Sequence, residues 1–154
     1  MDFFMKKKPA GQRSALAFDF GVKSIGVAFG NELTGKASPV TAIKARDGIP
    51  DQAAMERVFK EWAPDYVVVG LPLNMDGSFQ EVTYKARKFG NRLSEQFRIQ
   101  VFFQDERLTT KEARAELFDA GGFRALGKGD VDALSAVYIL EAFFQSAVPD
   151  EPGR

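Results

Sequence analysis

One segment, Tyr66–Leu71, restricts the fold of this chain more than any other. It is apolar at every position and contains three consecutive valines. A strand with one face in water alternates apolar and polar residues, whereas a strand covered on both faces is apolar throughout. The segment therefore predicts a central strand with helices on both sides of its sheet, which is the arrangement of α/β proteins.

The rest of the chain supplies the other elements of such a sheet. Periodicity and turn residues predict further strands over 15–20, 24–29, 36–43 and 99–103. Helices are expected over 52–62 with Asp51 as N-cap, over 79–97, from Thr109 to Gly121, and over 131–144. Short turns make the early strands antiparallel, and helical crossovers make the later ones parallel. The fold class is therefore α/β, with a five-stranded mixed β-sheet flanked by α-helices.

The length of the chain suits a single domain. With 154 residues it can bury a sizeable core. We expect a flexible N-terminal tail over 1–13, one domain over 14–146 and a C-terminal tail over 147–154. No apolar stretch is long enough to span a membrane, and the first basic residues follow a short apolar patch, the reverse of a secretory signal. These features predict a cytoplasmic protein with no membrane partner.

The composition excludes several kinds of chemistry. The chain contains neither histidine nor cysteine. It therefore has no Ser-His-Asp or Cys-His catalysis, no thiolate zinc site and no disulfide. Any enzymatic activity is expected to rest on carboxylates, alone or together with a metal, and oxygen-only ligands favour Mg²⁺ or Mn²⁺ over zinc. The net charge is zero, so a nucleic-acid partner would have to be attracted by local basic patches.

Acidic residues lie where three distant segments are expected to meet. Asp19 lies inside a short apolar strand, where an uncompensated charge costs several kcal/mol. Another strand is followed by Asp105 and Glu106, and the last helix begins near Asp130 and Asp132. Ligands gather at the carboxyl ends of strands in such sheets, and nucleases hold two divalent ions there with clustered carboxylates.

Each of these acids also has a structural interpretation. Asp19 can accept hydrogen bonds from turn amides beside Gly21, and Asp105 can be a turn residue. Asp130 is well placed to cap a helix that begins at Val131, whereas Asp132 lies one turn in among small residues. The acids taken together favour a metal site over three independent structural roles.

Four blocks of the sequence resemble one family in the right order. They are Ala17–Ala28 (AFDFGVKSIGVA), Val69–Gly77 (VGLPLNMDG), Asp105–Thr110 (DERLTT) and Val131–Ala136 (VDALSA). These blocks are similar to those of the YqgF (RuvX) family, whose fold is RNase H-like and related to the Holliday junction resolvases. The resemblance covers nearly the whole chain, from about residue 14 to residue 144.

The resemblance implies a function and a site. The family is described as nucleases that mature the end of precursor 16S ribosomal RNA, and earlier as Holliday junction resolvases. It implies metal-dependent hydrolysis of phosphodiester bonds, a nucleic-acid partner and a ribosomal precursor particle. It places the catalytic and metal-binding carboxylates on Asp19, Glu106 and Asp132. Strand alternation agrees, because Asp105 and Glu106 face opposite sides of a regular strand.

One feature departs from the wider superfamily. Other RNase H-like enzymes often carry a carboxylate near the end of the fourth strand, where this chain has Gly70-Leu71-Pro72. Glu106, on the neighbouring strand, therefore has to supply the missing ligand.

Basic residues provide candidates for contact with substrate. The turn after Asp19 contains Lys23 and Ser24, and Arg107 directly follows Glu106. Further candidates lie on the helix over 79–97 and in the glycine-rich loop before the last helix: Lys85, Lys88, Arg124 and Lys128. Such residues contact phosphates even in a neutral protein, although a solvated helix face has the same pattern.

Two other classes of protein share features with this sequence. Actin-like ATPases and sugar kinases also begin with Asp-x-Gly and a hairpin, but their folds need a second half for which 154 residues leave no room. A non-catalytic nucleic-acid-binding module for ribosome assembly would gain nothing from buried carboxylates that repel phosphate. A Holliday junction resolvase acting on branched DNA is the alternative within the same chemistry.

Overall fold

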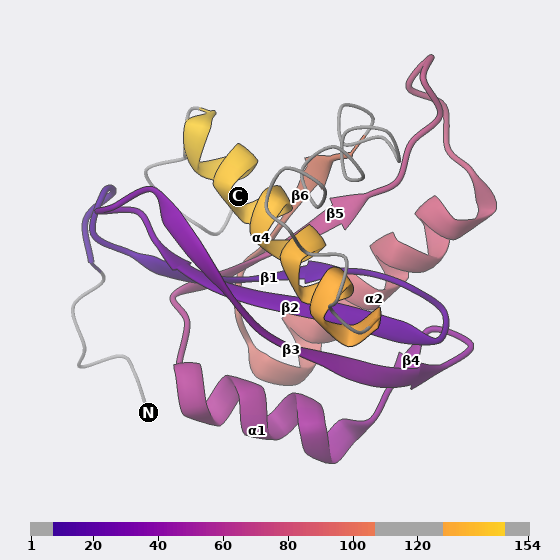
Figure 1. Ribbon diagram of the computed structural model, residues 1–154, viewed down its shortest axis with the longest axis horizontal. Helices are drawn as coiled ribbons and strands as arrows, with labels where there is room; N and C mark the ends of the chain where they lie inside the picture. The colour runs from indigo at the N-terminus through magenta and orange to yellow at the C-terminus, as the bar shows by residue number, and fades with distance from the viewer. Residues whose placement is uncertain (1–7, 107–127, 147–154) are drawn as a thin grey trace.

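The computed structural model describes residues 8–106 and 128–146 of the chain. Six strands form one sheet in the order β4-β3-β2-β1-β5-β6 (Figure 1). The strands are β1 (Ser14–Asp19), β2 (Ser24–Asn31), β3 (Lys36–Arg46), β4 (Ile49–Pro50), β5 (Tyr66–Leu71) and β6 (Val101–Asp105). The helices within the described ranges are α1 (Gln52–Trp62), α2 (Glu81–Phe97) and α4 (Lys128–Gln145).

The sheet has the predicted mixed topology. β1 pairs antiparallel with β2 and parallel with β5, and β5 pairs parallel with β6. The apolar strand β5 thus lies directly beside β1, which is an inner strand, as the sequence predicts. The predicted count of five strands is short by one, because β4 pairs through two residues only and has no periodicity to recognise.

Alternation along β1 separates the two faces of the sheet. Leu16 and Phe18 belong to the larger apolar cluster, which includes Met55 and Phe59 of α1 and Phe89 of α2. The small residues Ala15 and Ala17 lie on the other face, in a second cluster that α4 covers with the residues Ile139, Leu140 and Phe143. Figure 1 shows α4 crossing the sheet on the face opposite α1. Asp19, which has the parity of Ala15 and Ala17, therefore belongs to the α4 face.

The helix ends differ in how well the sequence predicts them. α1 occupies its predicted range, and the Asp51 carboxylate accepts a hydrogen bond from the backbone N–H of Ala54 at 3.0 Å. α2 begins two residues later than expected, after a capping box made by Gln80 and Thr83. The predicted helix from Thr109 to Gly121 lies outside the described residues.

The prediction that Asp130 caps a helix beginning at Val131 is wrong. α4 already begins at Lys128, so Asp130 lies within its first turn. The carboxylate still complements the helix dipole from that position, but it is not the residue that precedes the helix.

A closed polar cluster forms where β1 and β5 begin. The Glu32 carboxylate receives hydrogen bonds from Arg13 Nε at 3.0 Å and from the Tyr66 hydroxyl at 2.7 Å. Arg13 Nη2 lies 2.9 Å from the second carboxylate oxygen, and both charged side chains are 3% exposed. The guanidinium also lies over the Tyr66 ring, 5.3 Å from its centroid. Arg13, Glu32 and Tyr66 therefore satisfy one another away from water.

This cluster shifts the pKa of two of its members. Burial acts to raise the pKa of Glu32, but hydrogen bonds from Arg13, from Tyr66 and from the backbone together bring that pKa below its ordinary value of 4.5. Burial, followed by the hydrogen bond to the Glu32 carboxylate, raises the pKa of the Tyr66 phenol. The folded state thus favours an ionised Glu32 and a neutral Tyr66.

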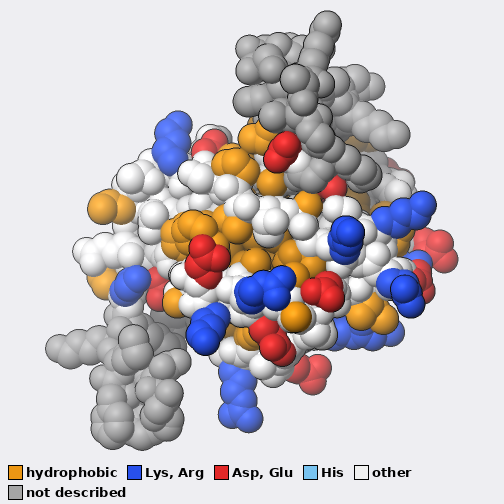
Figure 2. Space-filling view, turned by 60° about the horizontal axis from the view of Figure 1, so that its bottom comes forward, with side chains coloured by type: hydrophobic (Ala, Val, Ile, Leu, Met, Phe, Trp, Pro, Cys, Tyr) orange, Lys and Arg blue, Asp and Glu red, His pale blue; other side chains and the backbone are white. Residues whose placement is uncertain are grey.

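The outer surface carries both signs of charge. Figure 2 shows acidic and basic side chains interspersed over the face of the molecule on which α1 lies. This pattern agrees with the zero net charge of the chain. None of the helices in the described ranges combines the length and the apolar character needed to cross a bilayer.

Candidate active site

A cleft of about 360 Å³ opens at the carboxyl end of β1. Its lining contains the three carboxylates that the sequence singled out, Asp19, Glu106 and Asp132. They come from the end of β1, from the residue after β6 and from the second turn of α4. Lys23 and Ser24 line the same cleft, together with Pro72 and Val82. Segments more than 100 residues apart in sequence thus meet at one end of the sheet.

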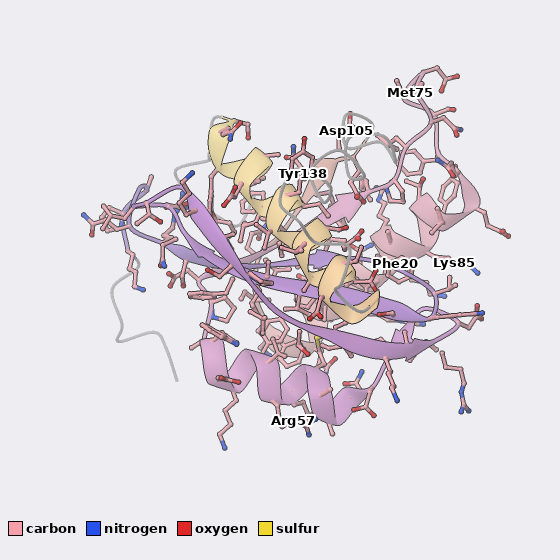
Figure 3. All side chains as sticks on the ribbon, viewed as in Figure 1. Phe20, Arg57, Met75, Lys85, Asp105 and Tyr138 are labelled. Atoms are coloured by element: carbon pink, nitrogen blue, oxygen red, sulfur yellow. The ribbon has the colours of Figure 1, made fainter. Side chains whose placement is uncertain are left out.

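Strand alternation explains which acid of the Asp105-Glu106 pair reaches the cleft. In β6, Phe103 packs with the α1 and α2 cluster, whereas Phe102 packs with the α4 cluster. Glu106 continues the α4 side, and its side chain is buried and lines the cleft. Asp105, labelled at the end of β6 in Figure 3, has the opposite parity and does not line the cleft.

Gly70 provides the space in which the Glu106 carboxylate lies. A Cβ atom at Gly70 would stand 2.5 Å from Glu106 Oε2 and 2.7 Å from Ile139 Cδ1. Gly70 is on β5, which pairs with β6, and the Glu106 carboxylate that follows β6 occupies the volume above the glycine. The position of the carboxylate therefore depends on the missing side chain at Gly70.

Gly26 has the corresponding role under α4. It pairs with Asp19 across β1 and β2, and a Cβ atom on it would overlap the backbone carbonyl group of Asp132. A side chain at this position would push the helix off the sheet. The contact brings the backbone of α4 onto β2 beside Asp19, and it explains why Asp132 rather than Asp130 lines the cleft.

Ser24 orients the Asp132 side chain. Its hydroxyl donates a hydrogen bond to Asp132 Oδ2 at 2.8 Å. Ser24 begins β2, and the turn before it contains Lys23, which is exposed at the mouth of the cleft. The turn is itself anchored, because Lys23 and Val22 accept backbone hydrogen bonds from Ala45 and Gly48 at 2.9 Å.

The donor set fits a hard divalent cation by its chemistry. All three acidic side chains offer oxygen ligands, which Mg²⁺ and Mn²⁺ prefer. Within residues 8–106 and 128–146, no three acidic side chains stand close enough to form a complete centre for one ion. Mg²⁺ usually takes one or two carboxylates and completes its shell with water and substrate phosphate. A site shared between carboxylates and substrate is therefore compatible with this spacing.

The other predicted substrate contacts are distributed less tightly. Lys85 Nζ lies 3.4 Å from Asp47 Oδ1, and Lys88 is exposed on α2. Figure 3 shows Lys85 on the same side of the molecule as Phe20, a residue that lines the cleft. Arg107 and Arg124 lie outside the described residues, as does the side chain of Lys128.

A larger cleft exists elsewhere but lacks this chemistry. It encloses about 630 Å³ between β3 and α1. Its two acids are both on or next to α1: Asp51 caps the helix, and Glu61 lies one turn from Arg57. The larger cleft is therefore a groove between a strand and a helix with mixed charges, whereas the smaller one gathers three carboxylates.

Sequence reasoning missed the two glycines and the role of Ser24 toward Asp132. Glycine inside a strand often marks a close approach of another group, and this signal was present at Gly26 and Gly70. The partner of Ser24 lies 108 residues away, so no local pattern indicates it.

Comparison with known proteins agrees with this architecture. The model of the RuvX family, described as "Holliday junction resolvase", matches residues 13–146. A protein of Pseudoalteromonas translucida named "Putative pre-16S rRNA nuclease" is 59% identical over 91% of this chain and 94% of its own length. An Aeromonas hydrophila protein of the same name is 62% identical over 86% of this chain and 95% of its own length.

Solved structures show the same fold. RuvC of T. thermophilus, in complex with a Holliday junction substrate, superposes with a TM-score of 0.51 at 14% identity, covering 86% of this chain and 94% of that one. The Fowlpox virus resolvase in complex with Holliday junction DNA gives a TM-score of 0.50 at 11% identity, covering 86% and 99%. The fold is thus the RNase H-like fold of these resolvases. The family match and the identities above show that the chain belongs to the RuvX family.

Proposed function

We propose that this protein is a divalent-metal-dependent nuclease of the endonuclease type that processes the 5′ end of precursor 16S ribosomal RNA. The observation that carries the proposal is the convergence of Asp19, Glu106 and Asp132 on one cleft beside Lys23. Carboxylates that line one cleft offer the oxygen ligands that a divalent cation prefers, and such a cation could bridge them to a phosphate. The names of relatives about 60% identical support the choice of substrate.

The three carboxylates are the proposed metal ligands, with Mg²⁺ or Mn²⁺ as the metal. A bound ion would supply an activated water and would stabilise the negative charge of the leaving oxygen. Ser24 holds Asp132 through its hydroxyl, so the carboxylate has a fixed orientation before substrate arrives. Lys23 is placed to neutralise a phosphate oxygen at the mouth of the cleft.

Further basic residues would guide the nucleic acid toward the cleft. Lys88 is exposed on α2, and Lys85 forms a partly exposed ion pair with Asp47, which is weak enough to exchange for a phosphate. Arg107, Arg124 and Lys128 are proposed for the same role from their places in the sequence.

One experiment tests the proposal against its alternatives. Purified protein with Mg²⁺ or Mn²⁺ is offered precursor 16S ribosomal RNA, unrelated single-stranded RNA and a four-way DNA junction side by side. We expect cleavage of the precursor that chelator abolishes. Cleavage of the junction alone would instead support a Holliday junction resolvase, the second candidate, which rests on the description of the family model. Binding of RNA without any cleavage would support a non-catalytic assembly module.

A further inference from the structure

An exposed aromatic residue lies beside the cleft without a role in the proposed chemistry. Tyr84, in the first turn of α2, is 63% exposed. Tyrosine suits a binding surface, because its ring offers a large apolar face while its hydroxyl group stays in contact with water. We propose that Tyr84 is a platform on which an unpaired nucleobase of the substrate stacks.

The ring of Tyr84 is held in place from behind. It packs against Phe79, with the ring centroids 4.9 Å apart and the planes tilted by 58°. Phe79 in turn carries the guanidinium of Arg87 at 5.9 Å from its centroid. A side chain supported in this way loses little conformational entropy when a base binds it. Phe79 and Arg87 are therefore positioning residues, and Tyr84 is the residue that would contact the base.

The first turn of α2 is fixed to the rim of the cleft. The hydroxyl of Thr83 donates to the backbone carbonyl of Pro72, and it accepts a hydrogen bond from the N–H of Gln80 at 2.9 Å. Pro72 lines the cleft together with the three carboxylates. Tyr84 directly follows Thr83, so it belongs to the helix turn that is joined to the rim of the cleft at Pro72. Figure 3 shows the loop that follows β5, with Met75 at its outer end, projecting on this side of the molecule.

The surroundings favour a nucleic acid over an apolar partner. Lys88 is exposed one helical turn after Tyr84, so a base on the ring would place its phosphate near a lysine. Stacking requires a free base face, which a nucleotide within a duplex does not offer. The inference rests on the proposed nuclease function, and it adds that the substrate is single-stranded next to the phosphate that enters the cleft.

Binding measurements with a non-cleaving protein test the inference. In the Asp19→Asn background, fluorescence anisotropy gives the Kd for a labelled single-stranded RNA and for the same RNA as a duplex. We expect Tyr84→Ala to weaken single-strand binding about ten-fold and to leave duplex binding unchanged, whereas Tyr84→Phe keeps the wild-type Kd. The matched control is Leu33→Ala, which removes another exposed apolar side chain, 79% exposed, from the turn between β2 and β3.

A spectroscopic readout separates stacking from a merely structural effect. 2-Aminopurine in the RNA loses fluorescence when it stacks on a ring, so the bound RNA should be quenched by the parent protein and by Tyr84→Phe but not by Tyr84→Ala. An unchanged single-strand Kd in Tyr84→Ala, or equal losses for single strand and duplex, would overturn the inference.

The outcome is distinguishable from failure of the proposed function. If no RNA or DNA is cleaved in Mg²⁺ or Mn²⁺, the nuclease proposal fails, but a single-strand defect of Tyr84→Ala can still be measured. If cleavage occurs and Tyr84→Ala binds single-stranded RNA normally, the stacking role of Tyr84 is refuted and the nuclease proposal stands.

Discussion

The two ends of β1 hold carboxylates in opposite settings. At its start, Glu32 is surrounded by donors from Arg13, Tyr66 and two backbone amides. At its end, Asp19 shares a cleft with two further carboxylates and with the exposed Lys23. The first arrangement compensates a buried charge within the chain, so it stabilises the fold. The second gathers negative charge at a surface cleft, so under the proposed function it depends on cations from solution.

The comparison predicts that changes at the two ends affect different quantities. Substitutions in the Arg13, Glu32 and Tyr66 cluster should lower the free energy of unfolding and leave the activity of the folded protein unchanged. Substitutions in the carboxylate cleft should lower activity and leave stability unchanged or higher.

The largest effect is expected for Asp19→Asn. The amide keeps the shape of the side chain but removes a negative charge from the proposed metal site, so cleavage should fall about 1,000-fold, equivalent to ~4 kcal/mol on the barrier. The thermal midpoint should stay or rise, because a repelling charge is gone. Glu106→Gln and Asp132→Asn should behave alike. Full activity of Asp19→Asn, or of the parent protein in chelator, would show that the cleft at the end of β1 has no metal-dependent catalytic role.

Arg13→Leu should have the largest effect on stability. It leaves the buried Glu32 carboxylate without its cation, and breaking such a pair costs about 3 kcal/mol. Urea unfolding measures the loss. The double variant Arg13→Leu/Glu32→Leu should recover part of it, since no charge is then left unpaired. A single variant with the stability of the parent would mean that water replaces the guanidinium.

Gly70→Ala tests whether the cleft depends on the space above β5. The new methyl group would collide with the ends of the Glu106 and Ile139 side chains, which can move at a cost of about 1–3 kcal/mol. We expect a clear loss of activity with a smaller loss of stability, measured by cleavage rate and thermal unfolding. The control is Gly35→Ala, in the β2–β3 turn at the other end of the sheet, where the left-handed backbone makes alanine unfavourable without affecting the cleft. Loss of activity in the control alone would contradict this role for Gly70.

The pH dependence of stability should come from the closed end. The pKa of Glu32 is lower in the folded state than its ordinary value of 4.5, so the unfolded chain binds more protons as the solution is acidified. The stabilisation is therefore fully present above about pH 4.5 and is lost as the pH falls through the lower folded pKa. Unfolding in urea at a series of acidic pH values should show this slope, and Glu32→Gln should flatten it. An equal slope in both proteins would assign the effect to other carboxylates.

The smallest effects are expected for the acids outside the cleft. Asp105→Asn and Asp130→Asn should keep most of the parent activity, because neither residue lines the cleft. Asp130→Asn should cost a few tenths of a kcal/mol through the helix dipole. An inactive Asp130→Asn would reverse the choice between Asp130 and Asp132.

Local pattern was sufficient to predict most of the fold. β5 is apolar on both faces because both faces are covered, and α1 begins where Asp51 caps it. Strand direction and alternation placed Asp19 and Glu106 at one end of the sheet. The choice of Asp132 over Asp130 came from the resemblance to the family.

Long-range pairing accounts for what the sequence did not reveal. Arg13 lies in a stretch that has the composition of a tail, and its partner Glu32 is 19 residues away. Tyr66 joins the pair from 34 residues beyond Glu32. No periodicity links these positions. The start of α4 was missed for a local reason, because Gly129 follows Lys128 and glycine disfavours helix.

The docking of α4 on Gly26 determines when, during synthesis, the carboxylate cleft can be completed. Asp132 and Ser24 are separated by 108 residues, and α4 follows every strand of the sheet along the chain. During synthesis the amino-terminal part emerges first, so Asp19 and Glu106 exist on a sheet with one bare face until the last helix arrives. The contact between Ser24 and Asp132 can form only after the last helix has been synthesised. A nascent chain thus carries an incomplete cleft, and the step that covers the apolar face is the same step that completes the cluster of acids.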